Sequence, residues 1–205
     1  MGTRNLTIIK DTSGKYAVAK YCQWDGYPSG QGITLLNFLN KAKAKLFFVP
    51  DLQRRLSENT IKVDEDQMRS LWVECGADPD SGLVSLEVSH KFKSQYPQLH
   101  RDMGAEIVEL IYNTVGNNTI PIRNYIEFAG DSLFCEYVYM VDLQTRKFRV
   151  FRGFNKNPLT SVEEFYFLQD EESEYKPVKE CASWSFSNLP SAEEFLKKLD
   201  VEEEL

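Results

Sequence analysis

Ten residues near the N-terminus, QWDGYPSGQG at positions 23–32, combine three glycines with a carboxylate and two large aromatic side chains. Backbone amides that precede a helix, together with the helix dipole, can hold an anion. Asp25 can accept hydrogen bonds from a ligand, and Trp24 and Tyr27 can form stacking walls beside it. We therefore predict a ligand-binding loop, and its candidate ligand-binding residues are Trp24, Asp25, Tyr27, Gly30 and Gly32.

A simpler interpretation of this stretch is a turn that connects a strand to a helix. Glycine adopts positive φ at no steric cost, and Pro28 restricts its own φ to a value that suits a turn. In that case Asp25 would hydrogen-bond its own backbone, and both aromatic rings would cover the core. A loop for nucleoside triphosphates is disfavoured, because the G-x-x-x-x-G-K-[ST] spacing is absent and Ile33 and Thr34 follow the last glycine.

The chain opens with MGTRNL, which accompanies the glycine-rich loop. Together these motifs resemble a widespread family of short phage, bacterial and fungal proteins, with N-termini that run G-T-R-[NG]-L and then aromatic-Asp-x-Tyr-Pro-x-Gly-x-Gly. The resemblance covers the first forty or so residues, and the residues on the shared pattern are Thr3, Arg4, Asp25, Tyr27, Pro28, Gly30 and Gly32. It implies an accessory protein, of the phage or mobile-element type, that engages a host protein or a small anionic ligand.

The opening is also similar, more weakly, to the N-terminus of N-terminal-nucleophile (Ntn) hydrolases, which often begin Met-Cys-Thr-Arg. In those enzymes a freed N-terminal Cys, Ser or Thr attacks an amide, and its own amine acts as the base. Gly2 has no nucleophilic side chain, so amide hydrolysis would need a cut that exposes Thr3, or recruitment of Cys22. Cys22 alternates with apolar neighbours, and we expect it in the core. This alternative implies an Ntn-hydrolase-like fold, with catalytic roles for Thr3, Arg4 and Asp25.

Composition narrows the classes of partner. The 205 residues carry 31 acidic and 24 basic side chains, a net charge of −7 that disfavours a broad electrostatic grip on nucleic acid. No apolar run is long enough to span a bilayer and no signal segment opens the chain, so we expect a cytoplasmic protein without a membrane partner. Four widely spaced cysteines without a C-x-x-C pair are typical of reduced thiols. We expect no cofactor and no metal site, because neither histidine has a second ligand three or four residues away.

Histidines and clustered basic residues are weaker candidates for a site. His90 and His100 flank a turn that contains Pro97, and we expect both to be solvated and not catalytic. The run RKFRVFR at 146–152 brings four basic residues near a hairpin end, where alternation puts Lys147 and Arg149 on one face. Charged patches of that size are common on protein surfaces. A structural or assembly role for the protein is a further alternative.

The N-terminal half of the chain contains a hairpin followed by helices. Residues 5–10 and 16–24 are rich in β-forming side chains and flank DTSGK, a turn composition. A helix directly after the glycine-rich loop is predicted by apolar residues at helical spacing, namely Leu35, Phe38, Leu39, Ala42 and Leu46. Residues 51–56 and 64–75 predict further helices, and 85–96 fits either a strand or a helix. Another helix is predicted by Leu99, Met103, Ile107, Val108 and Ile111.

From residue 119 onward the apolar period changes to two. This period predicts three antiparallel strands, over residues 119–129, 132–143 and 146–154, then an exposed acidic loop over 168–177 and a strand over 178–186. Ser191 and Glu194 form a capping box before a final helix over 191–199, and the terminal VEEEL is expected to be a frayed acidic end. We therefore predict a single α+β domain over residues 1–205, in which helices cover a mainly antiparallel sheet.

Overall fold

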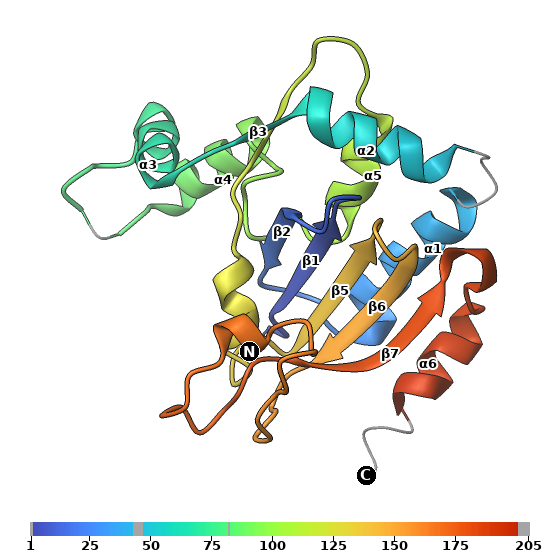
Figure 1. The fold of residues 1–205 in the computed structure, drawn as a ribbon. Coiled ribbons are helices and arrows are strands. Elements are labelled where there is room, and N and C mark those ends of the chain that lie inside the picture. The colour runs from blue at the N-terminus through green and yellow to red at the C-terminus, as the bar shows by residue number, and fades with distance from the viewer. Residues whose placement is uncertain (1, 43–46, 82, 201–205) are drawn as a thin grey trace.

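The computed structural model describes residues 2–42, 47–81 and 83–200, and it confirms an α+β fold (Figure 1). A five-stranded mixed sheet lies at its centre, with the order β2-β1-β5-β6-β7. The strands are β1 (Asn5–Lys10), β2 (Tyr16–Cys22), β5 (Tyr137–Asp142), β6 (Lys147–Arg152) and β7 (Lys179–Ser185). Neighbouring strands are antiparallel except for β1 and β5, which run parallel with Asn5 opposite Tyr137. The sheet is therefore mainly antiparallel around one central parallel pair.

The N-terminal hairpin of β1 and β2 forms as the sequence predicts. The Asp11 carboxylate accepts hydrogen bonds from two backbone amides of the turn, and Gly14 adopts a φ of 87°. Successive side chains of a strand point to opposite faces, so Leu6 and Ile8 lie on one side of β1 and Ile9 on the other. All three are buried, which shows that both faces of β1 are covered.

Helices cover one face of the sheet. They are α1 (Ile33–Ala42), α2 (Phe48–Asn59), α5 (Glu106–Asn113) and α6 (Ala192–Asp200). Their apolar sides form one core with sheet residues that include Tyr139, Val141 and Phe148. The capping box of the last helix is confirmed: the Glu194 amide donates to Ser191 Oγ, and the Ser191 amide donates to Glu194 Oε2.

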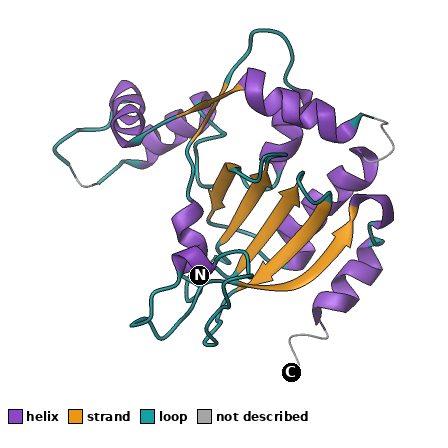
Figure 2. Cartoon of the chain, in the orientation of Figure 1, coloured by secondary structure: helices purple, strands orange, loops and turns teal. Residues whose placement is uncertain are grey.

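Loops lie on the opposite face, and Figure 2 shows them in front of the lower ends of the strands. Residues 155–178 cross this face with one short 3-10 helix, Tyr166–Leu168, and another 3-10 helix, Ile126–Gly130, lies near β2. Phe165 and Leu159 of the crossing segment join a second core with Met140 and other sheet residues. Both faces of the sheet thus carry their own apolar core.

Glu164 anchors the crossing segment to the sheet. Its carboxylate accepts hydrogen bonds from Lys10 Nζ (2.5 Å) and Tyr16 OH (2.7 Å), and it pairs with Arg149. These donors belong to β1, β2 and β6, so one side chain ties the segment to three strands. Burial acts to raise the pKa of Glu164, but the three hydrogen bonds outweigh burial and lower that pKa.

A lobe projects from this body (Figure 1). Its helices are α3 (Glu65–Glu74) and α4 (Leu86–Gln95), and its connecting ribbon pairs β3 (Thr60–Lys62) in parallel with β4 (Ile120–Ile122). The lobe has a small core of its own, in which the rings of Trp72 and Phe92 stack at 3.7 Å. Asp64 begins α3 through a capping box with Gln67.

Several sequence predictions need correction. The predicted strand over 119–129 is wrong: the extended part is Ile120–Ile122, which pairs with β3 outside the main sheet. The Asn124 side chain accepts a hydrogen bond from the Ile126 amide, and this local contact leads into the 3-10 helix. The ambiguous stretch 85–96 is the helix α4, which Ser85 caps. Leu99 and Met103 precede α5, which begins at Glu106.

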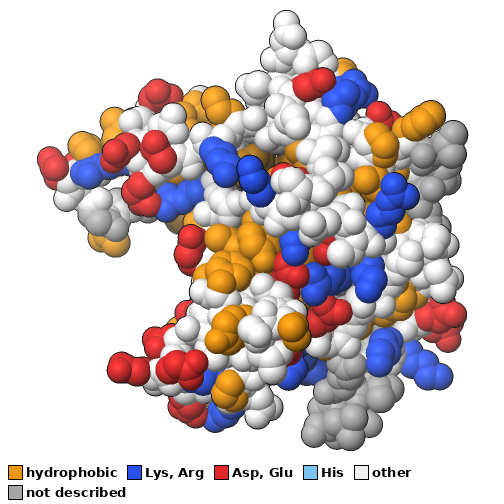
Figure 3. All heavy atoms as spheres, viewed as in Figure 1, with side chains coloured by type: hydrophobic (Ala, Val, Ile, Leu, Met, Phe, Trp, Pro, Cys, Tyr) orange, Lys and Arg blue, Asp and Glu red, His pale blue; other side chains and the backbone are white. Residues whose placement is uncertain are grey.

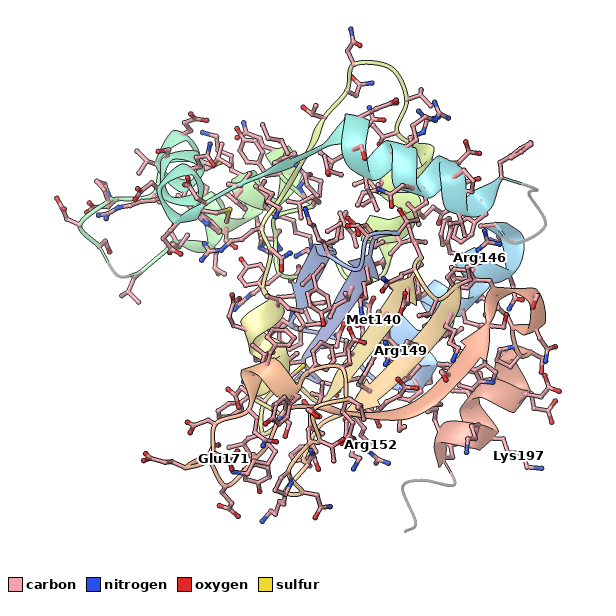
Figure 4. All side chains as sticks on the ribbon, viewed as in Figure 1. Met140, Arg146, Arg149, Arg152, Glu171 and Lys197 are labelled. Atoms are coloured by element: carbon pink, nitrogen blue, oxygen red, sulfur yellow. The ribbon has the colours of Figure 1, made fainter. Side chains whose placement is uncertain are left out.

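Two predicted features lie outside the described residues, namely the continuation of the first helix to Leu46 and the frayed end VEEEL. The basic run does not form one patch, because Figure 4 shows Arg146 and Arg152 at opposite ends of β6. Arg149 instead contacts carboxylates, including the fully buried Asp142 at 3.3 Å. Across the described parts of the chain, every helix is too short or too polar to cross a membrane.

Candidate functional site

The glycine-rich loop follows β2 at one end of the sheet. A π-helical turn, Pro28–Gly32, leads from this loop directly into α1. The Gly26 amide donates a 3.0 Å hydrogen bond to the Thr3 carbonyl, and the Gly26 carbonyl accepts a 2.7 Å hydrogen bond from Tyr139 OH. The loop is therefore held between the residues that precede β1 and the middle of β5.

Close packing requires glycine at all three glycine positions of the loop, Gly26, Gly30 and Gly32. A Cβ at Gly30 would lie 2.3 Å from the Asp25 carbonyl oxygen, and a Cβ at Gly32 would lie 2.9 Å from the Tyr139 ring. The amides of Gly26 and Gly30 both donate to backbone carbonyls, Gly30 to Tyr27 at 2.9 Å. These two amides are thus engaged inside the protein instead of facing an external anion.

Trp24, Asp25 and Tyr27, the side chains expected to contact a ligand, are all exposed. Asp25 adopts a left-handed backbone conformation with a φ of 55°. Trp24 Nε1 donates a 3.1 Å hydrogen bond to Asp102 Oδ1, and its ring packs against Gly2, where a Cβ would lie 2.2 Å from Trp24 Cε3. The indole is oriented by these contacts while 43% of it faces solvent.

Main-chain hydrogen bonds join four chain segments at this end of the sheet. The Glu136 amide donates to the Arg4 carbonyl at 3.0 Å, and the Gly153 amide donates to the Glu136 carbonyl at 2.8 Å. The Phe154 amide donates to the Ser132 carbonyl at 2.7 Å. With the bond between Gly26 and Thr3, these contacts connect residues 2–4, 23–32, 131–136 and 153–155 near the N label of Figure 1. We call the following side chains on these segments the sheet-end face: the exposed Trp24, Asp25, Tyr27, Phe134 and Phe154, and the half-buried Arg4.

Arg4 and Thr3, the residues of the hydrolase alternative, occupy different environments. The Arg4 guanidinium lies 4.3 Å above the Phe134 ring, and its Nε is buried without a hydrogen-bond partner among the described residues. Thr3 is 4% exposed, and its carbonyl binds the Gly26 amide. The structure therefore brings Thr3 and the loop of Asp25 together through backbone contacts, whereas the Arg4 head group faces an aromatic ring.

Polar side chains also lie beneath the helices on β1 and β2. Lys20 is opposite Thr7, and its Nζ donates 2.8 Å hydrogen bonds to the carbonyls of Tyr21 and His100. Burial lowers the pKa of Lys20 to about 8. Cys22 is fully buried on the same face, which confirms its predicted place in the core, and burial raises the pKa of its thiol.

A recess of about 270 Å³ lies beside this polar group. It is lined by Lys93, Pro97, His100, Asp102, Met103 and Glu106. The Asp102 carboxylate accepts a 2.6 Å hydrogen bond from Lys93 Nζ in addition to the one from Trp24. Burial acts to raise the pKa of Asp102, but its partners, Lys93 first among them, lower that pKa overall. Asp102 thus links the sheet-end face to the recess.

Ser89, His100 and Asp102 have the residue types of a hydrolase triad, but their hydrogen bonds run in the wrong direction. The Asp102 amide donates to His100 Nδ1 at 3.3 Å, so Nδ1 is an acceptor and the ring proton of neutral His100 is on Nε2. A nucleophile needs the opposite tautomer, in which Nε2 accepts the proton of Ser89 Oγ, 3.4 Å away. His100 is also buried, which corrects its predicted exposure, and burial lowers its pKa.

Some residues of this region were not predicted as functional. Phe134 and Phe154 flank strands in sequence, and local periodicity does not show that β5 and β6 bring them to the N-terminal segments. Lys20 is a charged residue within β2, and its charge would predict a side chain that points to solvent. In the structure it is buried. Asn5 and Thr7 of β1 are also polar residues at alternate positions of a strand. They are buried because the chain covers both faces of β1.

The candidate site therefore has three parts. They are the sheet-end face, the buried Lys20 with its carbonyl partners, and the recess that is lined in part by His100 and Asp102. Within residues 2–42, 47–81 and 83–200 there is no group of three or more His, Cys, Asp and Glu side chains that could hold a metal ion. Comparisons of the chain with models of protein families, with curated proteins and with solved structures find no match.

Proposed function

We propose that this chain is a binding protein that engages a partner protein through the sheet-end face. Four aromatic side chains of this face are exposed to between 42% and 55% of their surface: Trp24, Tyr27, Phe134 and Phe154. Trp, Tyr and Arg are the residue types that contribute most of the binding free energy at protein interfaces. Arg4 lies against Phe134, which places a cation within the aromatic group.

The observation that carries the proposal is the backbone conformation of Asp25 and Phe154. Both residues have left-handed φ values, 55° and 54°, and both side chains are exposed. A left-handed conformation costs a bulky residue such as Phe154 about 1–2 kcal/mol, whereas Asp adopts it more readily. Strained residues of this kind concentrate at functional sites, where the surrounding structure holds them in place. Two of them on neighbouring segments favour a surface that is kept for recognition.

A partner protein fits this face better than a small anion does. The amides of Gly26 and Gly30 donate to carbonyls of the protein itself, and Asp25 brings a negative charge to the loop. Exposed aromatic rings around one cation and one carboxylate suit a mixed apolar and polar protein surface.

An accessory role of the phage or mobile-element type, in the cytoplasm, agrees with this proposal. It rests on the resemblance of the two N-terminal motifs, and the free thiols of Cys22, Cys75 and Cys135 are in keeping with a reducing compartment. The amide-hydrolase alternative rests on the weaker resemblance, and burial of Thr3 places its hydroxyl out of reach of a large substrate.

Site-specific photo-crosslinking tests the proposal. A benzoylphenylalanine in place of Tyr27 should give one discrete crosslinked protein in cells that produce this chain. The matched control is the same replacement at Phe167, an equally exposed aromatic residue on the crossing segment. Identical products from both positions, or no product from Tyr27, would contradict a binding function of this face.

The intact mass of the purified protein separates binding from hydrolysis. A chain that starts at Gly2 has no N-terminal threonine nucleophile, and its native mass reports a bound partner or ligand in the same measurement. Turnover of amide substrates that Thr3→Ala abolishes would overturn a purely binding role.

A further inference from the structure

We propose that the lobe carries a second docking surface, a groove between α3 and residues 77–81 and 84 that binds a basic amphipathic segment of a protein. This inference does not depend on the sheet-end face, because the groove is formed by the lobe together with Arg123. Its volume is about 330 Å³, larger than that of the recess beside Asp102.

The floor of the groove is apolar. It is formed by Met68, Trp72, Val73 and Val84, and Val73 is 40% exposed. Leu83 and Leu86, close in sequence to Val84, are also apolar and have more than three quarters of each side chain in solvent. Exposed apolar side chains that are rimmed by polar residues are typical of interaction sites.

The rim of the groove is acidic. Residues 64–87 contain seven acidic side chains and one basic side chain, Arg69. Arg69 donates a 2.6 Å hydrogen bond to the Pro79 carbonyl, and Arg123 pairs with Glu65, so both cations of the groove already have partners within the protein. Asp66 and Asp78 remain exposed on its lining. Figure 3 shows acidic side chains on the lobe, with hydrophobic and basic ones among them.

Charge and shape together select the occupant. Apolar side chains of a partner would fill the floor over Val73 and Val84, and Lys or Arg side chains beside them would meet Asp66 and Asp78. A nucleic acid or an anionic membrane would be repelled by the same carboxylates. A helix with leucines along one side and lysines on the other has this pattern.

Fluorescence anisotropy with a labelled model helix of leucine and lysine tests the proposal. We expect this peptide to bind with one site per chain, and a peptide with glutamate in place of lysine not to bind. Val73→Lys should raise the Kd of the lysine peptide about tenfold, because it removes apolar contact and adds a like charge. Lysine is a good helix former, so α3 should persist, and circular dichroism of the variant checks this.

Val115→Lys is the matched control, because Val115 is exposed on the loop before β4 and the substitution adds the same charge. The Kd should change less than twofold in this variant. Equal effects of the two substitutions, or equal binding of a peptide with the same residues in scrambled order, would show attraction to net charge only and would overturn the groove as a docking site. Binding of neutral phosphatidylcholine vesicles that Val73→Lys abolishes would overturn the choice of a protein segment as the occupant.

Discussion

The Tyr139 hydroxyl, in the middle of β5, donates a 2.7 Å hydrogen bond to the Gly26 carbonyl of the glycine-rich loop. Tyr139 is fully buried, and burial raises the pKa of its phenol, so the hydroxyl keeps its proton and acts as a donor. The ring also closes the space above Gly32. A single side chain therefore ties the loop that presents Trp24 and Tyr27 to the centre of the sheet.

Tyr139→Phe should lower the free energy of unfolding by about 1–3 kcal/mol, because it leaves a buried carbonyl without its donor. Urea denaturation measures this change. Tyr27→Phe is the control: its side chain is more than half exposed, and stability should stay within about 0.5 kcal/mol of the parent protein. Equal stabilities of the two variants would show that the Tyr139 hydrogen bond does not support the loop.

Gly32→Ala should destabilise the protein by about 1–3 kcal/mol, because the added methyl group overlaps the rings of Tyr139 and Phe195. Gly130→Ala offers a comparison, since the nearest atom to its Cβ is 3.2 Å away on the side chain of Leu168. Thermal unfolding should give the lower Tm for Gly32→Ala. The reverse order would mean that α1 and α6 adjust to fill this space freely.

Asp25→Gly and Asp25→Val should separate backbone strain from recognition. Glycine tolerates the left-handed conformation, so stability should be equal to or above that of the parent, whereas valine should lower it by about 1–2 kcal/mol. Both variants lack the carboxylate, and both should reduce the crosslinked product formed from position 27. A glycine variant that crosslinks as well as the parent would remove Asp25 from the binding surface.

The N-terminal hairpin and the helices were largely predictable, because their signals are local. Asp64 with Gln67, and Ser191 with Glu194, mark helix starts through pairs of residues that are three positions apart. The ribbon of β3 and β4 was not predictable in this way. A strand of three residues is too short to show a hydrophobic period. Ile120 also pairs with Thr60, although the helices of the lobe lie between these two residues in the sequence.

The candidate site was predictable only in its loop. Trp24, Asp25 and Tyr27 stand out because large side chains interrupt a turn composition. Phe134 and Phe154 join them through the pairing of β1 with β5 and of β5 with β6. Strand pairing of this kind is a tertiary property that no local pattern contains.

Acid should loosen the segment that crosses the loop-covered face. The folded-state pKa of Glu164 is lower than its ordinary value, so the stabilisation it gives is complete above that ordinary value and is lost as pH falls through the lowered pKa. Limited proteolysis within residues 155–178 should accelerate as pH falls below about 4.5, the ordinary pKa of a glutamate. Glu164→Gln should show fast cleavage already at pH 7. Cleavage that is insensitive to both changes would contradict the anchoring role of this side chain.

Lys20 should make stability rise with pH in the alkaline range. Its folded-state pKa is about 8, against an ordinary value of 10.5, so between these values the folded protein binds fewer protons than the unfolded chain. The free energy of unfolding contributed by Lys20 therefore increases from pH 8 to pH 10.5. Urea denaturation across this pH range should be carried out on the parent protein and on Lys20→Met. The difference between their free energies of unfolding isolates the contribution of Lys20 from that of the tyrosines. A difference that does not vary with pH would show that the amine is not desolvated.

The parallel pairing of β1 with β5 also determines how the chain can fold while it is being made. Asn5 must meet Tyr137, so the hairpin of β1 and β2 leaves the ribosome long before its central partner strand exists. At elongation rates of about 5–20 residues per second, that interval lasts on the order of ten seconds. During this time one edge of β1 exposes backbone groups and apolar side chains that later lie in the middle of the sheet. Newly made chains should therefore be clients of chaperones that hold nascent polypeptides until β5 emerges.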